Sequence, residues 1–247
     1  MQPLPVVRSF PPVRLSGHPE GHPEGHPEGH PEGWPEGQAG GLERDALALL
    51  DAVELQRAAA MMPGPRAAFL AGRLAQRRFA AELLGVPAAR LTVDYRCPRC
   101  GTGPGVSHGR PGYAVSGSSL AGSAAPLLLS LSRSSGWILL AAVPDPEPGL
   151  RLGIDVEDPA RMDFDGFDDV ALAPAERQEL LGLAGPALLR GRARLWTRKE
   201  AWLKMGGEGL RTAPETLDVL HRAGLRDLSA AETGLPADLV AAVGLSA

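Results

Sequence analysis

Residues 127–157 decide the fold class of this chain, and they read LLLSLSRSSGWILLAAVPDPEPGLRLGIDVE. Two apolar runs, Leu127–Ser132 and Trp137–Val143, flank the turn-prone residues RSSG and predict a buried β-hairpin. Another strand is expected at Leu150–Val156. Helices and strands along the chain do not alternate in the regular way that a parallel sheet requires, so we predict an α+β fold.

Segments on both sides of this stretch show helical or strand patterns. Apolar residues at helical spacing predict four helices, at residues 42–60, 66–84, 174–183 and 186–205. Gly85 and Pro87 are expected to end the second helix. Further strands are predicted at residues 91–95 and near residues 217–220 and 239–243, whereas residues 96–124 resemble a loop because they are rich in Gly, Ser and Pro.

The N-terminal part of the chain contains a four-residue repeat, GHPEGHPEGHPEGHPEGWPEG, at residues 17–37. A proline at every fourth position removes helix donors and favours extended backbone, so residues 1–41 are predicted to form a disordered tail. A His-rich tract can bind metal. We interpret the repeat as a spacer; its histidines are His18, His22, His26 and His30.

Composition excludes several classes of function. The 247 residues are 44% hydrophobic, which is enough for a packed core, and the net charge of -4 argues against a nucleic-acid partner. The longest apolar run, Trp137–Val143, is far shorter than the ~20 residues that span a bilayer. The first residues lack a secretory signal pattern, and two cysteines are too few for a disulfide framework. We therefore expect a cytoplasmic protein with no membrane partner.

The segment Gly153-Ile-Asp-Val-Glu157 carries the first candidate site. Side chains alternate across a strand, so Asp155 and Glu157 share one face, and Gly153 should leave space beside them. Two close carboxylates repel each other unless a cation lies between them, and oxygen ligands suit Mg²⁺. An acidic pair that faces solvent at a strand end would have the same sequence, so this pattern alone leaves both interpretations open.

The second candidate site is the segment WTRKEAWLK, residues 196–204. On a helix, Trp196, Glu200, Leu203 and Lys204 lie on one stripe, and the apolar members favour burial of that stripe. The alternative is an exposed Glu–Lys pair, which contributes only a few tenths of a kcal/mol. The pattern suggests Glu200 as a third metal carboxylate, with Lys199 and Lys204 as cations for phosphate.

These two motifs together resemble the paired signature of the Sfp-type 4′-phosphopantetheinyl transferases. In that family G-(I/V)-D-(I/V)-E is followed by W-(S/T)-x-K-E-(S/A)-x-x-K and then G-x-G-L, and GIDVE, WTRKEAWLK and GEGL meet every position here. Weaker similarity extends over about residues 66–210. The element HGRP ending at Pro111 resembles the family's coenzyme A element through Arg110, and SLSRS at residues 130–134 resembles its S-x-S-H-S strand end.

The sequence departs from the family at Arg133, where a histidine that contacts the pyrophosphate is usual. Arginine keeps a cation there and adds a planar fork of donors, so we expect phosphate binding to survive. The resemblance also suggests Arg66, Arg73 and Arg77 as a basic helix near the 3′-phosphate. A solvated helix face would explain these three arginines equally well.

The resemblance implies a fold of two similar α+β lobes related by pseudo-two-fold symmetry, an N-terminal lobe at residues 42–149 and a C-terminal lobe at residues 150–247. It implies that coenzyme A binds between the lobes, that Mg²⁺ is held by Asp155, Glu157 and Glu200, and that a serine of an apo acyl or peptidyl carrier protein accepts the phosphopantetheine. Asp155, Glu200 as base and Lys204 are the expected catalytic residues. The expected coenzyme A contacts are Arg66, Arg73, Arg110, Pro111, Ser132, Arg133, Lys199 and Lys204. A monomer is expected.

Three other functions would each explain part of this sequence. A non-catalytic or regulatory coenzyme A-binding homologue would explain Arg133, although all three carboxylates and both lysines remain. An unrelated phosphotransferase would need a phosphate-cradling glycine loop, and no G-x-x-x-x-G-K-(S/T) occurs. A metal-storage protein would be built around the histidine repeat.

Cys97-Pro-Arg-Cys100-Gly has the form of half a zinc knuckle. Zinc usually takes four Cys or His ligands, but no second C-x-x-C exists and His108 adds one ligand at most. The sequence therefore favours a buried or reduced thiol pair.

Overall fold

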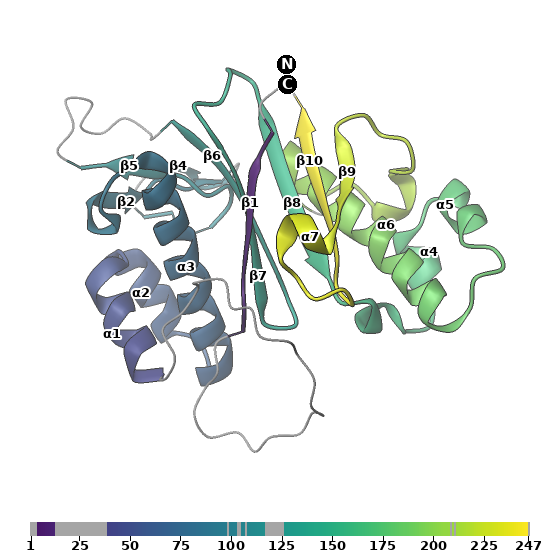
Figure 1. The fold of residues 1–247 in the computed structure, drawn as a ribbon, viewed down its shortest axis with the longest axis horizontal. Helices are drawn as coiled ribbons and strands as arrows, with labels where there is room; N and C mark the ends of the chain where they lie inside the picture. Colours follow the sequence, from purple (N-terminus) through teal and green to yellow (C-terminus); the bar gives the residue numbers. More distant parts are fainter. Residues whose placement is uncertain are drawn as a thin grey trace.

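The structure is a computed structural model, and it describes residues 4–12, 39–97, 99–102, 105–106, 108–116, 126–207, 209 and 211–246. Two three-stranded antiparallel sheets lie at the centre, and a long helix covers the outer face of each (Figure 1). The inner faces of the sheets meet in a shared core of aliphatic side chains, which includes Leu139 and Val143 from one sheet and Leu152 and Val156 from the other. This architecture confirms the predicted α+β class.

The first sheet has the strand order β1-β7-β6, with β1 at Val6–Phe10, β6 at Leu127–Ser134 and β7 at Trp137–Pro144. The predicted hairpin is confirmed as β6 and β7. The 22-residue helix α3, Pro63–Leu84, packs on this sheet together with α1, Ala39–Leu49, and α2, Ala52–Ala59. Alternate β7 side chains enter two different cores because successive residues of a strand point to opposite faces.

The second sheet has the order β8-β10-β9, with β8 at Arg151–Glu157, β9 at Leu225–Leu228 and β10 at Val240–Ser246. Helix α6, Gly185–Gly206, lies along β8 and β10. Shorter helices complete this half, namely α4 at Phe167–Ala171, α5 at Pro174–Glu179 and α7 at Ala230–Thr233. Three 3-10 turns are Ala88–Arg90, Pro159–Met162 and Pro214–Thr216.

The two halves share one order of elements. Each begins with a strand, continues with a 22-residue helix, and ends with two strands of which the last pairs with the first. In the first half these elements are β1, α3, β6 and β7, and in the second they are β8, α6, β9 and β10. The pseudo-two-fold relation between the lobes stays a prediction, but this common order is the pattern that it requires.

The predicted tail at residues 1–41 is wrong for its first part. Residues Val6–Phe10 form β1, and Phe10 is buried because it pairs with Ile138 of β7 and joins the core beneath α3. Helix α1 already begins at Ala39. The histidine repeat at residues 17–37 lies outside the described residues. The first lobe therefore includes a strand that precedes the repeat.

Two other elements differ from the sequence-based expectation. The single helix predicted at residues 42–60 is divided into α1 and α2 at Asp51, which has extended backbone and whose carboxylate accepts a hydrogen bond of 2.6 Å from the Val93 amide. The strand predicted near residues 217–220 is wrong, because that segment passes beneath α6 as irregular chain and the strand forms later, as β9.

The predicted loop at residues 96–124 contains three short strands. These are β3 at Arg96–Cys97, β4 at Gly101–Thr102 and β5 at Tyr113–Val115, of which β3 pairs with β4. Strand β5 pairs instead with β2, Leu91–Val93, the strand predicted at residues 91–95.

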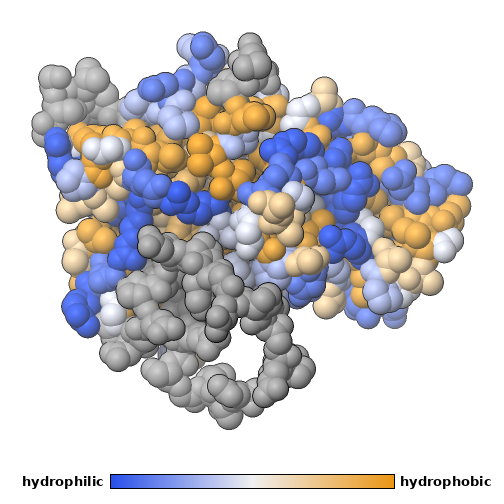
Figure 2. Space-filling view, in the orientation of Figure 1, coloured by the Kyte–Doolittle hydropathy of each residue, from blue (hydrophilic) through white to orange (hydrophobic). Residues whose placement is uncertain are grey.

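Hydrophilic and hydrophobic side chains are mixed on the surface shown in Figure 2. Hydrophobic atoms gather at the end of this face where α4 and α5 lie, and Val170 and Leu181 are among the exposed aliphatic residues of that region. Within the described part of the chain, no helix combines the length and apolarity that crossing a lipid bilayer would need.

Candidate functional site

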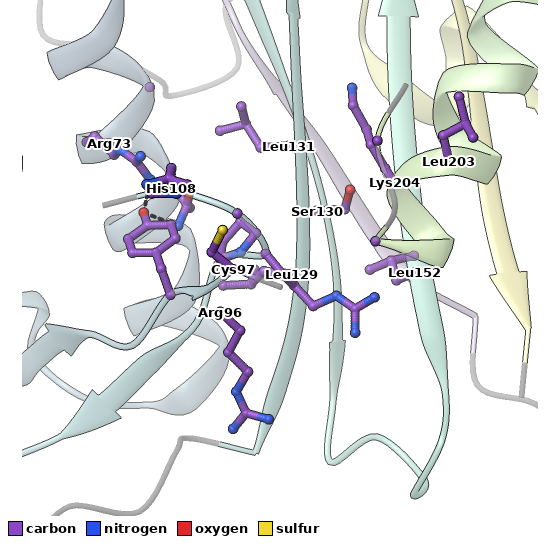
Figure 3. Close-up of a pocket in the computed structure, with 18 of the residues that line it drawn as sticks. Arg73, Arg96, Cys97, His108, Leu129, Ser130, Leu131, Leu152, Leu203 and Lys204 are labelled. Carbon is purple, nitrogen blue, oxygen red and sulfur yellow. Dashed lines mark hydrogen bonds between the residues drawn. The ribbon is translucent and has the colours of Figure 1, made fainter. Parts of the chain in front are cut away.

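A cavity of about 700 Å³ lies between the two halves of the molecule. Its walls come from α3, from the segment around β3 and β4, from β6, and from the C-terminal end of α6 (Figure 3). Figure 3 shows Arg73 and His108 on one side and Lys204 on the other, with Leu129 to Leu131 of β6 between them. Residues of both halves therefore line the cavity, which lies where the sequence predicted a site between the lobes.

The cavity wall is strongly cationic. None of the described residues that line it carries a carboxylate, whereas its cations are Arg57, Arg73, Arg96, Arg110, Arg133 and Lys204. Burial lowers the pKa of Arg110, and its neighbours Arg151 and Arg96 lower it further. Burial also lowers the pKa of Arg133, with a smaller contribution from Arg57. Cations held close together in this way favour a ligand with several negative charges.

Asp155 lies beside this wall and is almost fully buried, at 2% exposure. Its Oδ1 accepts hydrogen bonds from the Lys204 ammonium and the Ser132 hydroxyl, each at 2.6 Å. Its Oδ2 is buried and has no hydrogen-bond partner among the described residues. Burial raises the pKa of Asp155, while Lys204 and Ser132 oppose that rise. The solvent-facing acidic pair considered above is therefore wrong for Asp155.

The other two predicted metal ligands, Glu157 and Glu200, form no hydrogen bond with Asp155 but interact with it through charge. Glu157 accepts a hydrogen bond of 3.2 Å from Ser134, and burial together with the charge of Asp155 raises the pKa of Glu157 to about 7. Burial and Asp155 also raise the pKa of Glu200. In the described residues, these three acids do not form a group whose ligand atoms all lie within 4.8 Å of one another. The three carboxylates therefore influence one another electrostatically, but their oxygen atoms are not gathered around a single point.

The residues fit a divalent cation in their chemistry. A buried carboxylate oxygen without a partner is costly unless a cation or donor reaches it, and Asp155 Oδ2 is such an atom. Burial is the main cause that raises the pKa of all three carboxyl groups, and the charge of Asp155 raises the pKa of Glu157 and Glu200 further, so a cation at this place would stabilise their charged forms. Oxygen-only ligands with open positions are the kind of site that Mg²⁺ uses beside phosphate.

Gly153 has a different role from the one expected. It does not leave space beside the carboxylates, because α6 fills that space: a Cβ atom at Gly153 would collide with the Ala201 carbonyl and lie 2.6 Å from the Met205 amide nitrogen. The glycine therefore lets β8 pack directly on the backbone of α6. This close approach brings Asp155 of β8 to Lys204 of α6.

Serine side chains of β6 hold β8 from the other side. Ser130, Ser132 and Ser134 are all buried and share one face of β6. Ser130 accepts a hydrogen bond from the Ile154 amide, and Ser132 donates to Asp155. Ser132 was predicted to contact coenzyme A, but in the structure it positions Asp155 and accepts a hydrogen bond of 3.0 Å from Lys204.

The prediction that Lys199 binds phosphate is wrong in this structure. Lys199 is fully buried in the second half, where its ammonium lies 2.6 Å from the carboxylate of Glu176, also fully buried. It donates further to the carbonyl oxygens of Pro214 and Leu217. Lys199 and Lys204 are five positions apart on α6, so they point in different directions, and only Lys204 reaches the cavity.

The arginines and the proline of the first half that were predicted to lie at the coenzyme A site divide into two groups. Arg73, Arg110, Pro111 and Arg133 line the cavity. Arg110 donates a hydrogen bond of 3.0 Å to the Met205 carbonyl at the C-terminal end of α6, where a cation is favoured by the helix dipole. It therefore connects the two halves at the cavity.

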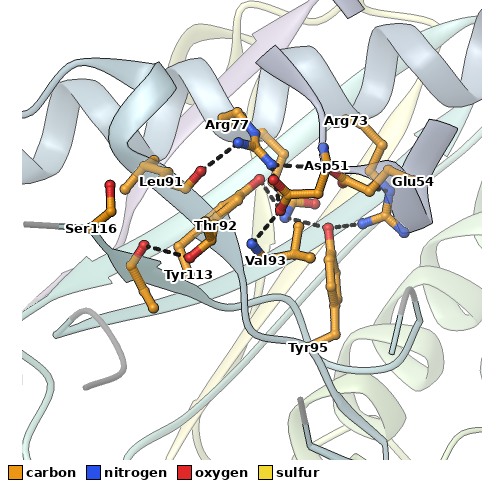
Figure 4. A network of polar contacts seen from close by, with 12 residues as sticks. Asp51, Glu54, Arg73, Arg77, Leu91, Thr92, Val93, Tyr95, Tyr113 and Ser116 are labelled. Carbon is orange, nitrogen blue, oxygen red and sulfur yellow. Dashed lines mark hydrogen bonds and ion pairs between the residues drawn. The ribbon is translucent and has the colours of Figure 1, made fainter. Parts of the chain in front are cut away.

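Arg66 and Arg77 do not line the cavity. Arg66 forms an ion pair of 3.1 Å with Glu43 near the start of α3. Arg77 is buried, donates to the Leu91 carbonyl and pairs with Glu54 and Asp51 at 3.0 and 3.1 Å (Figure 4). This network fastens α2 to α3 and β2, so Arg77 supports the first lobe.

Several lining residues were missed by the sequence motifs. Arg57 on α2 and Arg96 on β3 add two cations, and Tyr95 accepts a hydrogen bond from Arg73 while its ring lies 4.4 Å from that guanidinium. No local pattern marks Arg57 or Arg96, because their positions depend on how α2 and β3 pack. The alternation of Leu91, Val93 and Tyr95 predicted a strand but did not indicate a site.

Comparison with known proteins finds a family match over the part of the chain that contributes the second half of this site. Residues 151–236 match the family model of the 4′-phosphopantetheinyl transferase superfamily, whose members are transferases. The matched residues include β8 with Asp155 and Glu157, and α6 with Glu200 and Lys204. No curated protein matches the chain.

Proposed function

We propose that this protein is an Sfp-type transferase that moves 4′-phosphopantetheine from coenzyme A to a serine of an apo acyl or peptidyl carrier protein. The observation that carries the proposal is the arrangement around Asp155: its unpartnered buried Oδ2 and its partner Lys204 lie at the edge of a cavity lined by cations. The match of residues 151–236 to the transferase superfamily supports the same reaction.

Coenzyme A suits the cavity in charge and size. It carries a pyrophosphate and a 3′-phosphate, and six cationic side chains line the cavity. Cavities that hold small ligands and cofactors have volumes of about 300–1,000 Å³, and this one has about 700 Å³. We assign the phosphates to the cationic wall, with Arg110 and Arg133 as the contacts from the first lobe.

The metal site is proposed at Asp155, Glu157 and Glu200. When bound, Mg²⁺ neutralises charge on phosphate oxygens, which is the chemistry that phosphoryl-type transfer needs most. The chain's own contribution is positional: Ser132 and Lys204 fix Oδ1 of Asp155, which leaves Oδ2 for the cation.

Lys204 and Glu200 have complementary proposed roles in the transfer. Lys204 stabilises the phosphate that departs with adenosine 3′,5′-bisphosphate, because its ammonium is partly exposed and lies at the cavity wall. Glu200 accepts the proton of the carrier serine. Burial and Asp155 raise the pKa of Glu200, and a carboxylate with a raised pKa is a stronger proton acceptor.

The test uses a panel of apo carrier proteins with coenzyme A and Mg²⁺, read by intact mass. We expect a mass gain of one phosphopantetheine group on at least one carrier. Asp155→Asn should abolish the gain while coenzyme A binding, measured by calorimetry, persists. The control is Glu179→Gln, which alters a half-exposed carboxylate on α5 and should keep full transfer.

The panel of carrier proteins also distinguishes a transferase from the main alternative. A non-catalytic coenzyme A-binding homologue would bind coenzyme A with the wild-type chain yet modify no carrier. Transfer that is equally fast in Asp155→Asn and the wild type would contradict the role given to Asp155.

A further inference from the structure

A second cluster of metal-ligating side chains lies at the cavity wall, away from the carboxylates. The ligand atoms of Cys97, Cys100 and His108 all lie within 4.8 Å of one another. The Sγ of Cys100 is 3.3 Å from Nε2 of His108. We propose that these three residues bind one Zn²⁺ ion, which is a site separate from the transferase chemistry proposed above.

The two cysteines are presented by a small antiparallel turn. Strand β3 ends at Cys97, whose partner in the ladder is Gly101 of β4, so Cys97 and Cys100 lie at either end of the turn between the strands. Gly101 has a φ of 79°, a left-handed conformation that favours glycine. The C-x-x-C-G spacing of this turn thus places both thiols on the same side of a tight hairpin.

His108 is brought to the thiols by a second backbone pairing. Arg96 and Arg110 form an antiparallel bridge, with backbone hydrogen bonds of 3.0 and 2.9 Å. Gly109, which directly precedes Arg110, has a φ of 91°, and a Cβ atom there would collide with the Arg96 carbonyl oxygen and lie 3.0 Å from the Cα of Cys97. Only a glycine permits this approach, so the backbone itself holds His108 against the cysteines.

The distances and atom types suit zinc. In a tetrahedral site with Zn–S bonds of about 2.3 Å, ligand atoms are roughly 3.8 Å apart, and the cluster needs only small adjustments to reach that spacing. Two thiolates and an imidazole form a soft ligand set that favours Zn²⁺ over Mg²⁺. Cys100 is exposed and Cys97 is half-buried, so water can complete the fourth position.

The proposed ion would stabilise one wall of the cavity. Between Arg96 and Arg110 the strands β3 and β4 are short, and among the described residues of this segment only Val106 is buried, yet both arginines line the cavity. A metal that joins the turn to His108 would hold these two cations in place. Sequence reasoning favoured a reduced thiol pair because it found at most three ligands; the structure shows that the third is within reach.

The experiment is a cobalt titration of the reduced full chain, because Co²⁺ replaces Zn²⁺ and thiolate ligands produce a near-ultraviolet charge-transfer band. The histidine repeat also attracts metals, so the background protein carries His→Gln changes at His18, His22, His26 and His30. We expect one equivalent of Co²⁺ to produce the thiolate band, and one equivalent of Zn²⁺ to abolish it.

Two variants decide the ligands. Cys100→Ser should remove most of the band. His108→Gln keeps both thiols and should weaken zinc binding about a hundredfold or more, since even outer-shell partners of a metal account for ten- to a hundredfold. Circular dichroism checks that each variant is folded. No thiolate band in the reduced background protein, or a band of equal strength in Cys100→Ser, would overturn the proposal.

A second readout leaves all three proposed zinc ligands unchanged. In the background protein, alkylation of Cys97 and Cys100 should slow strongly when Zn²⁺ is added and recover when a chelator removes it. Thiols that react at the same rate with and without Zn²⁺ would also overturn the site. Neither readout requires transferase activity, so failure of the zinc site leaves the proposed function unaffected.

Discussion

Replacement of Lys199 by methionine tests whether this lysine of α6 stabilises the fold, in contrast to Lys204 of the same helix, which lies at the cavity wall. Lys199 and Glu176 are both fully buried, and the ammonium is 2.6 Å from the carboxylate. Glu176 also accepts hydrogen bonds from the amides of Ala173 and Val219, at 2.8 and 2.9 Å. Methionine preserves the length of the side chain but leaves the Glu176 carboxylate without its countercharge.

The expected cost follows from that geometry. Removal of one partner from a buried ion pair lowers the free energy of unfolding by about 3–5 kcal/mol, because the remaining charge stays buried. The carbonyl oxygens of Pro214 and Leu217 lose their donor in the same substitution. We therefore expect a loss at the upper part of this range, with the Glu176→Gln, Lys199→Met double variant losing less than the sum of the single changes.

The assay is urea unfolding followed by circular dichroism, with coenzyme A affinity measured on the folded protein. The control is Arg66→Met, which removes a half-exposed ion pair with Glu43 and should cost about 0–1 kcal/mol. If Lys199→Met unfolded like the wild type and instead lost coenzyme A affinity, Lys199 would be a phosphate ligand and the reasoning from burial would be refuted.

Three further predictions concern the cavity, the N-terminal strand and the acidic face of β8. Arg133→Ala should raise the dissociation constant of coenzyme A about ten- to a hundredfold in calorimetry, since a charge-assisted contact contributes about 1.5–3 kcal/mol; an unchanged affinity would mean that Arg133 contacts no phosphate. Phe10→Ala should lower the unfolding free energy by about 3 kcal/mol, while a Gly-Ser replacement of residues 17–37 of equal length should leave the melting temperature unchanged. Burial raises the pKa of Glu157 to about 7, so the metal-free protein should become less stable as the pH rises from about 4.5 to 7, by about 1–2 kcal/mol after allowance for solvent screening. Thermal melts at several pH values measure this dependence, and Glu157→Gln should flatten it.

Much of the architecture could be predicted because its signals are local. The hairpin of β6 and β7, strand β8 and helices α3 and α6 each have a periodic apolar pattern over eight or more residues or a run bounded by turn residues. The two motifs on β8 and α6 were likewise visible in sequence, since residue spacing within one element places side chains on a shared face.

Strand β1 could not be predicted because it has no pattern of its own. Its five residues lie before a proline-rich repeat, and only pairing with β7 makes them a strand. The division between α1 and α2 is similar. Asp51 can continue a helix in isolation, but contacts with Arg77 and the Val93 amide fix it as a break.

The sequence by itself determined which residue types stand on β8 and α6, and its family resemblance implied that acids and a lysine from these two elements would share one region. Only the tertiary structure decided which members do so. Lys199 and Lys204 are equivalent as charges in the sequence, yet the packing of α6 buries the first against Glu176 and leaves the second at Asp155. Periodicity within a helix fixes the angle between two side chains; the neighbouring elements set which direction leads to the core and which to the cavity.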